Sequence, residues 1–100
     1  MSEFELDIET WISEKFKSPE RVKIILDPLR NLNTAVNISR VVRCVLMLSE
    51  SDYDSLEHYV KKAAIDFRDV IWISEYDNRN TRKYNFNFGL YSQQPYTYSE

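Results

Sequence analysis

The sequence predicts a single, mainly α-helical domain of four or five short helices around one core, followed by an extended or β-hairpin C-terminal segment. Three observations carry this prediction. Apolar side chains recur at steps of three and four along most of the chain up to residue 75. The chain of 100 residues has one glycine, which disfavours turns with positive φ and favours helices joined by Asn, Asp, Ser and Pro. Beyond residue 83 the apolar pattern alternates.

The first predicted helix runs from about Glu3 to Phe16. Ser2 and Glu5 stand at the spacing of a capping box, which predicts the start of a helix there. One face is apolar and consists of Phe4, Ile8, Trp11, Ile12 and Phe16.

The second predicted helix begins at Ser18-Pro19, because serine suits the N-cap and proline suits the first helical position. Pro28 disfavours a helical Asp27 and limits this helix to about three turns. Residues 30–33 predict a loop. The apolar face consists of Val22, Ile25, Leu26 and Leu29.

Residues 34–49 fit two patterns. Ile38, Val41, Val42, Val45 and Leu46 form a helical stripe, while alternate residues from Val36 to Leu48 fit a strand broken at Arg40. The many β-branched residues favour a strand. Length, together with Arg40 and Arg43 on one helical face, favours a helix, and a helix is our prediction.

Two further helices are expected before residue 77. Ser51 with Asp54 predicts the start of a helix over 51–65, with Lys61 and Lys62 in its last turns. Asp66 predicts the N-cap of a short helix from Phe67 to about Glu75, with Val70, Ile71 and Ile73 facing inward. The alternative is a buried strand from Val70 to Tyr76.

The C-terminal segment decides between two fold classes. Tyr84, Phe86, Phe88 and Leu90 alternate with Asn85, Asn87 and Gly89, which indicates an extended segment. If residues 70–76 are also extended, residues 77–81 are a hairpin loop, and the fold is α+β with residues 36–48, 70–76 and 83–91 in one sheet. We expect one globular domain over residues 1–91 and a polar tail over residues 92–100.

Composition excludes several classes. The lone cysteine, Cys44, cannot form an intramolecular disulfide, and it lies in an apolar run where a small buried side chain is expected. The N-terminus lacks a basic region followed by an apolar stretch, and no run is long enough for a membrane span. We therefore expect a cytoplasmic protein, without a membrane partner and without a cofactor, since a glycine-rich phosphate loop is also missing.

The net charge of −3 conceals alternating blocks. Residues 1–20 and 50–77 are rich in acids, whereas residues 21–49 and 78–99 are rich in bases. Neighbouring blocks would attract one another once packed, which is the structural interpretation that we favour. The functional alternative is a dipolar surface that steers a charged partner.

Candidate catalytic groups are scattered. Asp52 and Asp54 coincide with a helix start, so capping accounts for them better than metal binding. His58 is a lone histidine, and no His/Cys cluster has zinc spacing. An enzyme would have to draw its acid and base groups from Asp66, Asp69, Glu75 or His58, and would need a polar pocket beside them.

Two surfaces are candidates for binding. The first combines cations with aromatic side chains: Arg79, Arg82, Lys83, Tyr84, Phe86, Phe88 and Tyr91. Its structural interpretation is that the aromatic groups pack on the core while the basic residues lie in a solvated turn. The second is the helical face that bears Arg40 and Arg43, which either pair with acids of residues 50–77 or hold an acidic or phosphate-bearing partner.

The leading functional hypothesis is a non-enzymatic protein-interaction module that contacts a protein through its aromatic C-terminal segment, as a homodimer or as a small inhibitor or immunity-type partner. The alternative is a nucleic-acid-associated protein that uses Arg79, Arg82 and Lys83 with neighbouring aromatic rings. The overall acidity of the chain argues against this alternative.

Overall fold

The computed structural model describes residues 4–31, 38–76, 84, 86, 89 and 90. Over these residues the chain forms five α-helices and one short 3-10 helix, and Tyr76 is an isolated bridge residue rather than part of a strand. The mainly helical fold class is therefore confirmed. The elements are α1 (Leu6–Lys15), α2 (Pro19–Leu26), η1 (Asp27–Asn31), α3 (Ile38–Ser49), α4 (Tyr53–Ile65) and α5 (Phe67–Glu75).

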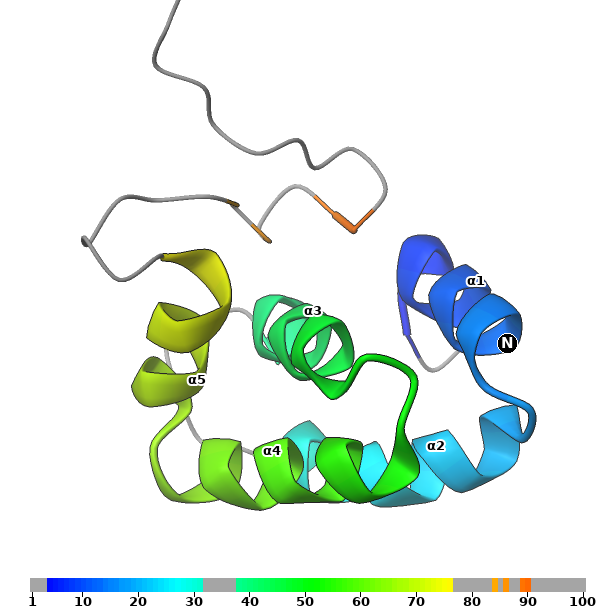
Figure 1. The fold of residues 1–100 in the computed structure, drawn as a ribbon, viewed down its shortest axis with the longest axis horizontal. Coiled ribbons are helices and arrows are strands. Elements are labelled where there is room, and N and C mark those ends of the chain that lie inside the picture. The colour runs from blue at the N-terminus through cyan, green and yellow to red at the C-terminus, as the bar shows by residue number, and fades with distance from the viewer. Residues whose placement is uncertain (1–3, 32–37, 77–83, 85, 87–88, 91–100) are drawn as a thin grey trace, which may run out of the picture.

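Helix α3 occupies the centre of the molecule (Figure 1). Helices α2 and α4 run along one side of it, and α1 and α5 flank it at opposite ends of the view. The described part of the C-terminal segment crosses α3 on the side away from α2 and α4. The core is made by side chains from all five helices and by Phe86 and Leu90 of the C-terminal segment.

The central position of α3 explains why its sequence fits two patterns. Val41, Val42, Cys44, Val45 and Leu46 are all inaccessible to solvent. Neighbouring elements also bury a residue outside its main apolar stripe, Cys44, so alternate apolar residues of this helix resemble a strand as well. The predicted helix is confirmed over residues 38–49, and the strand alternative is wrong there; residues 34–37 lie outside the described part.

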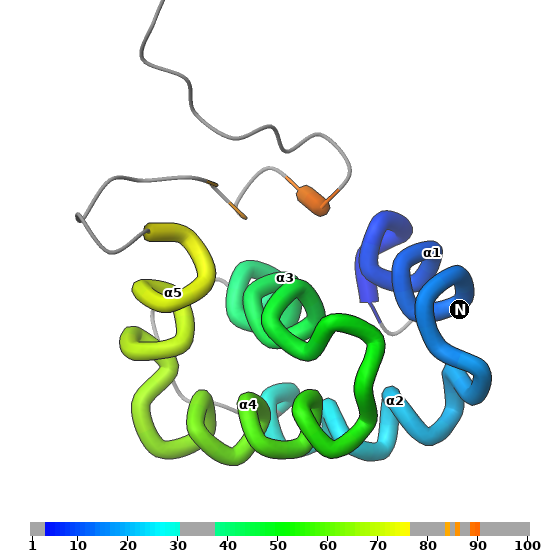
Figure 2. Tube along the Cα trace, viewed as in Figure 1, coloured from blue at the N-terminus to red at the C-terminus, as the bar shows by residue number. Residues whose placement is uncertain are grey.

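The helix starts differ from the sequence prediction in two places. Helix α1 begins at Leu6 with Glu5 as its N-cap, not at Glu3. Helix α4 is capped by Asp52, whose carboxylate accepts a hydrogen bond from the Ser55 amide at 2.9 Å. Ser51 is not the cap, because it has a φ of 67° and belongs to the left-handed turn between α3 and α4. The tube in Figure 2 shows how sharply the chain reverses there.

The end of α2 corrects a second prediction. Arg30 lies in η1 rather than in a loop. Pro28 has no amide hydrogen to continue the α-helical ladder, so α2 ends at Leu26. Its fixed φ remains compatible with a 3-10 helix, and the chain continues in that form and buries Leu29 completely.

The short helix predicted after Asp66 is confirmed as α5. The Asp66 carboxylate caps it by accepting a hydrogen bond from the Arg68 amide at 3.1 Å. Residues 70–75 are helical, so the hairpin that pairs residues 70–76 with 84–91 is wrong. Ile73 was expected to face inward but is 39% exposed. The hairpin loop over 77–81 and the tail over 92–100 lie outside the described residues.

No described helix has both the length and the apolar character needed to cross a membrane.

Candidate functional site

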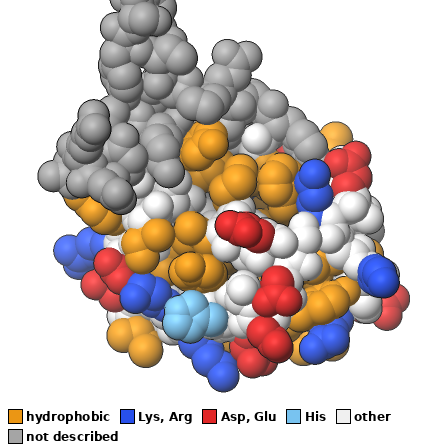
Figure 3. Space-filling view, in the orientation of Figure 1, with side chains coloured by type: hydrophobic (Ala, Val, Ile, Leu, Met, Phe, Trp, Pro, Cys, Tyr) orange, Lys and Arg blue, Asp and Glu red, His pale blue; other side chains and the backbone are white. Residues whose placement is uncertain are grey.

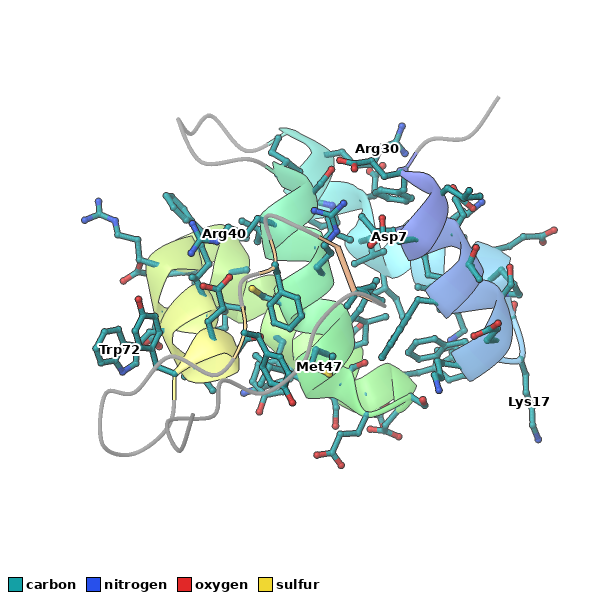
Figure 4. All side chains as sticks on the ribbon, turned by 90° about the horizontal axis from the view of Figure 1, so that it is seen from above. Asp7, Lys17, Arg30, Arg40, Met47 and Trp72 are labelled. Atoms are coloured by element: carbon teal, nitrogen blue, oxygen red, sulfur yellow. The ribbon has the colours of Figure 1, made fainter. Side chains whose placement is uncertain are left out.

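Arg40 on α3 forms a bidentate ion pair with Glu75 at the end of α5. Its Nε and Nη2 atoms donate to the two carboxylate oxygens at 2.9 and 2.7 Å (Figure 4). The Glu75 side chain is completely buried, whereas that of Arg40 is 20% exposed. A buried carboxylate requires such a partner, because burial without one disfavours its charged form strongly. This pair therefore fixes the end of α5 against the start of α3.

Arg43, one turn further along α3, binds the opposite side of the molecule. Its Nε donates to Asp7 at 2.9 Å and its Nη2 donates to Glu5 at 2.7 Å. Its Nη1 donates to the backbone carbonyl of Phe86 at 2.8 Å. Only 3% of the Arg43 side chain is exposed, so the guanidinium is held on three sides by α1 and the C-terminal segment.

The same acids hold the C-terminal segment by its main chain. The Phe86 amide donates to Glu75 Oε2 at 3.1 Å, and the Leu90 amide donates to Asp7 Oδ2 at 3.0 Å. The Tyr84 amide donates to the backbone carbonyl of Glu75 at 3.3 Å. We call the side chains of Asp7, Arg40, Arg43 and Glu75 the polar clasp.

The charges of the polar clasp stabilise one another. Burial alone would raise the pKa of Asp7, but hydrogen bonds from Arg43 and from the Leu90 amide, with the Arg43 charge, leave this pKa below its ordinary value. The hydrogen bond with Glu75 raises the pKa of Arg40 despite partial burial. Burial would lower the pKa of Arg43, yet its bonds and charge interactions with Asp7 and Glu5 raise it. All three groups therefore stay charged at neutral pH.

The two arginines chosen from the sequence are thus occupied by internal partners. Arg40 pairs with an acid of residues 50–77, as the structural interpretation predicts. Arg43 pairs instead with the acidic N-terminal block, which the sequence analysis did not single out for it. Helical spacing could have suggested this for Asp7, which precedes the buried Ile8 and lies close to the apolar face of α1.

The first candidate surface is described only in part. Phe86 is completely buried and packs in the core, as the structural interpretation of these aromatic residues expects. Tyr84 is partly buried and stacks on Phe86 with ring centroids 5.3 Å apart. The remaining residues proposed for this surface lie outside the described part of the chain: Arg79, Arg82, Lys83, Phe88 and Tyr91.

The groups considered for catalysis are spread over α4 and the two ends of α5. Asp66 caps α5, and Asp69 pairs with Lys62 of α4 at 3.0 Å. Glu75 lies about 9 Å further along the α5 axis than Asp69, given the helical rise. His58 is exposed on α4, with its ring 5.0 Å from that of Tyr59. Each of the three acids already has a structural contact.

Cys44 is buried in α3, as the sequence predicts. Burial raises the pKa of its thiol to about 12, so the thiolate is scarce at neutral pH. Because the thiolate is the reactive form of cysteine, Cys44 contributes packing rather than nucleophilicity.

An apolar surface on α5 was missed. Trp72 is 48% exposed and lies on the outer side of the helix, away from α3 (Figure 4). Its ring stacks on that of Tyr76 with centroids 4.7 Å apart. We call Trp72, Ile73 and Tyr76 the α5 edge. The signal was present in the sequence, since Trp72 falls outside the inward-facing set predicted for this helix.

Ion pairs outside the polar clasp also join neighbouring helices. Lys23 of the basic block bonds to Glu9 of the acidic N-terminal block at 2.8 Å. On the face shown in Figure 3, acidic and basic side chains are interspersed rather than gathered by sign. Attraction between neighbouring charge blocks therefore serves folding in this structure.

Among the described residues, no three His, Cys, Asp or Glu side chains are grouped so that they would hold a metal ion. Comparisons of the chain with models of protein families, with curated proteins and with solved structures find no match.

Proposed function

We propose that this chain is a non-enzymatic protein-interaction module that binds its partner through the α5 edge and the adjoining C-terminal segment. The observation that supports this most is the 48% exposure of Trp72 on a helix whose Val70 and Ile71 are buried. Tryptophan carries more apolar surface than almost any other side chain, and exposed tryptophan is typical of binding surfaces. Stacking on Tyr76 holds its ring in place before a partner arrives.

The sequence that follows Tyr76 is rich in cations. Residues 77–83 connect Tyr76 to Tyr84, and the Tyr84 amide bonds to the Glu75 carbonyl, so both ends of the connection meet at α5. The connection carries Arg79, Arg82 and Lys83. Tryptophan, tyrosine and arginine are the residue types that dominate binding energy at protein interfaces. The partner expected is a protein that offers an apolar pocket beside acidic groups.

The contacts of the acidic residues favour binding over catalysis. Asp66 caps a helix, and Asp7 and Glu75 hold the C-terminal segment by its main chain. If one of these carboxylates left its contacts to transfer a proton, the fold would lose bonds that stabilise it. These acids are therefore better suited to maintain the shape of a binding surface than to act on a substrate.

The test is affinity purification of the tagged full chain from its source cells, with and without nuclease, followed by mass spectrometry and measurement of the affinity of each captured protein. The critical variant is Trp72→Ala. The matched control is Leu6→Ala, since Leu6 is 80% exposed on α1 at the other end of the molecule (Figure 1). Both substitutions are at exposed positions, and circular dichroism checks that both variants fold.

We expect a protein that survives nuclease and binds the Leu6→Ala variant as it binds the wild type. Its affinity for Trp72→Ala should fall by about thirtyfold or more, the effect of losing a central aromatic residue from an interface. Equal affinity for both variants would contradict the α5 edge as the contact. Capture that nuclease abolishes would favour nucleic acid as the ligand of the same cations and rings.

A further inference from the structure

A second surface lies on the opposite side of α3, along α2 and η1. Its side chains recur at steps of three and four, so they share one face, and they line a hollow of about 390 Å³. Ile24 stands in this face with 74% of its surface exposed. We call this face the α2 stripe; it consists of Glu20, Lys23, Ile24, Asp27 and Arg30.

Ile24 separates that hollow from another on its α4 side. The second hollow measures about 200 Å³ and includes Ile24, Pro28 and Val60 in its wall. Ile24 projects from the surface, and the hollows beside it could each receive a projecting side chain. This combination suits a two-fold contact, in which the same surface of each copy provides both parts.

The order of charges along the α2 stripe is complementary in sign to the same order read in reverse. Read from the N-terminus, the stripe is acid, base, isoleucine, acid, base. If a second copy lies antiparallel, Glu20 faces Arg30 of that copy, and Lys23 faces its Asp27. Ile24 then lies within one helical turn of the two-fold axis. A parallel arrangement would instead place each charge against its like, which costs several kcal/mol.

We propose that the α2 stripe binds a second copy of this chain in an antiparallel, two-fold arrangement. This inference does not depend on the proposed function, because the α5 edge and the α2 stripe lie on different helices on different sides of α3 (Figure 1). A dimer formed through α2 leaves both α5 edges free for partners.

The charges of the stripe already have neighbours, and these pairs are easily exchanged. Arg30 bonds to Asp27 at 3.1 Å, with side chains 43% and 60% exposed. Exposed ion pairs of this kind contribute little to stability, so exchanging the contact with Asp27 for one with Glu20 of the second copy costs little. Lys23 contacts Glu9 at 2.8 Å and remains 30% exposed, so it can serve both acids.

The size of the surface predicts a weak dimer. A two-turn helix with its 3-10 extension offers less area than a stable interface of standard size. Glu57 and Lys61 of α4, beside the second hollow, widen it. Their mutual distance of 3.8 Å shows a loose pair that is also free to reorient. We therefore expect monomer and dimer in exchange.

The test is sedimentation of the full chain from about 1 μM to about 1 mM, the range in which small interfaces associate. The wild type should show a dimer that weakens as salt rises from about 50 mM to about 500 mM, because surface charges are screened. Ile24→Asp should abolish the dimer, since it places two carboxylates near the axis. Leu6→Asp, an equally exposed apolar residue on α1, is the matched control and should dimerise as the wild type does.

Charge exchange tests the antiparallel register. Glu20→Lys and Arg30→Glu should each weaken the dimer about tenfold, because each creates two like-charged contacts. The double variant reverses both pairs and should recover to within about threefold of the wild type. Glu20 and Arg30 are both exposed, and urea unfolding checks that the variants remain folded.

A wild type that stays monomeric at about 1 mM would overturn the proposal. So would a dimer that survives Ile24→Asp, or a double variant that does no better than the single ones. Trp72→Ala should dimerise like the wild type, so loss of partner binding in that variant and loss of dimerisation in Ile24→Asp are independent results.

Discussion

Arg43 connects three separate parts of the structure. It links α1, α3 and the backbone of Phe86 while its side chain remains 3% exposed. A guanidinium can do this because its planar array of donors reaches two carboxylates and a carbonyl at once. Buried ion pairs of this kind add less to stability than apolar packing would, but losing one partner leaves the others buried without a bond.

Arg43→Met should therefore lower the free energy of unfolding by about 3 kcal/mol, because Asp7 and the Phe86 carbonyl would lose their partner. Urea unfolding followed by circular dichroism measures this change. Arg30→Met is the matched control, since the exposed Arg30–Asp27 pair predicts a change within about 0.5 kcal/mol. Equal effects of the two substitutions would contradict the structural role of Arg43.

Asp7 gives the molecule an acid-sensitive contact. Its pKa is lower in the folded chain than in the unfolded one, so its contribution to stability is present above about pH 4 and is lost as pH falls through the folded pKa. Asp7→Asn removes this contribution at every pH. The difference in unfolding free energy between wild type and Asp7→Asn should shrink from about pH 5 to about pH 2, as urea titrations would measure. A difference that is constant over this range would contradict the lowered pKa.

At the scale of elements, single side chains fix the starts of α4 and α5. Asp52 and Asp66 start α4 and α5 by accepting hydrogen bonds from amides that have no partner inside the helix. Between α3 and α4, Glu50 and Ser51 adopt φ of 50° and 67° without being glycine. The turn is thus held by the helices that it joins rather than by the preference of its own residues.

Asp52→Ala should lower the free energy of unfolding by about 1 kcal/mol, the usual effect of losing an N-cap. Ser51→Ala should change it by less than about 0.5 kcal/mol, although the sequence pattern favours Ser51 as the cap. Thermal or urea unfolding of the two variants compares them directly. A larger effect at Ser51 would restore the capping box predicted from the sequence.

At the scale of the whole molecule, the polar clasp joins segments that are distant in the chain. The bond from the Leu90 amide to Asp7 spans 83 positions, and that from Arg43 to the Phe86 carbonyl spans 43. Phe86 and Leu90 complete the core on the side of α3 that α2 and α4 leave open. Phe86 and Leu90 are therefore part of the core that the structure describes.

Phe86→Ala should lower the free energy of unfolding by about 3–5 kcal/mol, because it empties a site in the core that is inaccessible to solvent. Tyr84→Ala removes a partly exposed ring and should lower it by about 1 kcal/mol. Urea unfolding measures both. If Phe86→Ala instead left stability intact and impaired only partner binding, Phe86 would be an interaction residue.

Local chemistry determined much of the fold in advance. The stripe of Ile8, Ile12 and Phe16 predicted the buried face of α1, because a helix places residues three and four apart on one side. Asp66 predicted the start of α5, because its carboxylate reaches an amide two residues away. Such interactions lie within one turn of the chain, so the sequence carries them without reference to the rest of the molecule.

Tertiary structure decided what local pattern left open. Residues 38–49 are helical because packing against α4, α5, η1 and α1 buries the apolar stripe of a helix there, which outweighs the preference of their β-branched residues for strands. The partner of Arg43 was decided in the same way. The sequence showed that its charge needs an acid, but only the approach of α1 placed Asp7 at 2.9 Å, since pairing between distant segments depends on packing rather than on spacing.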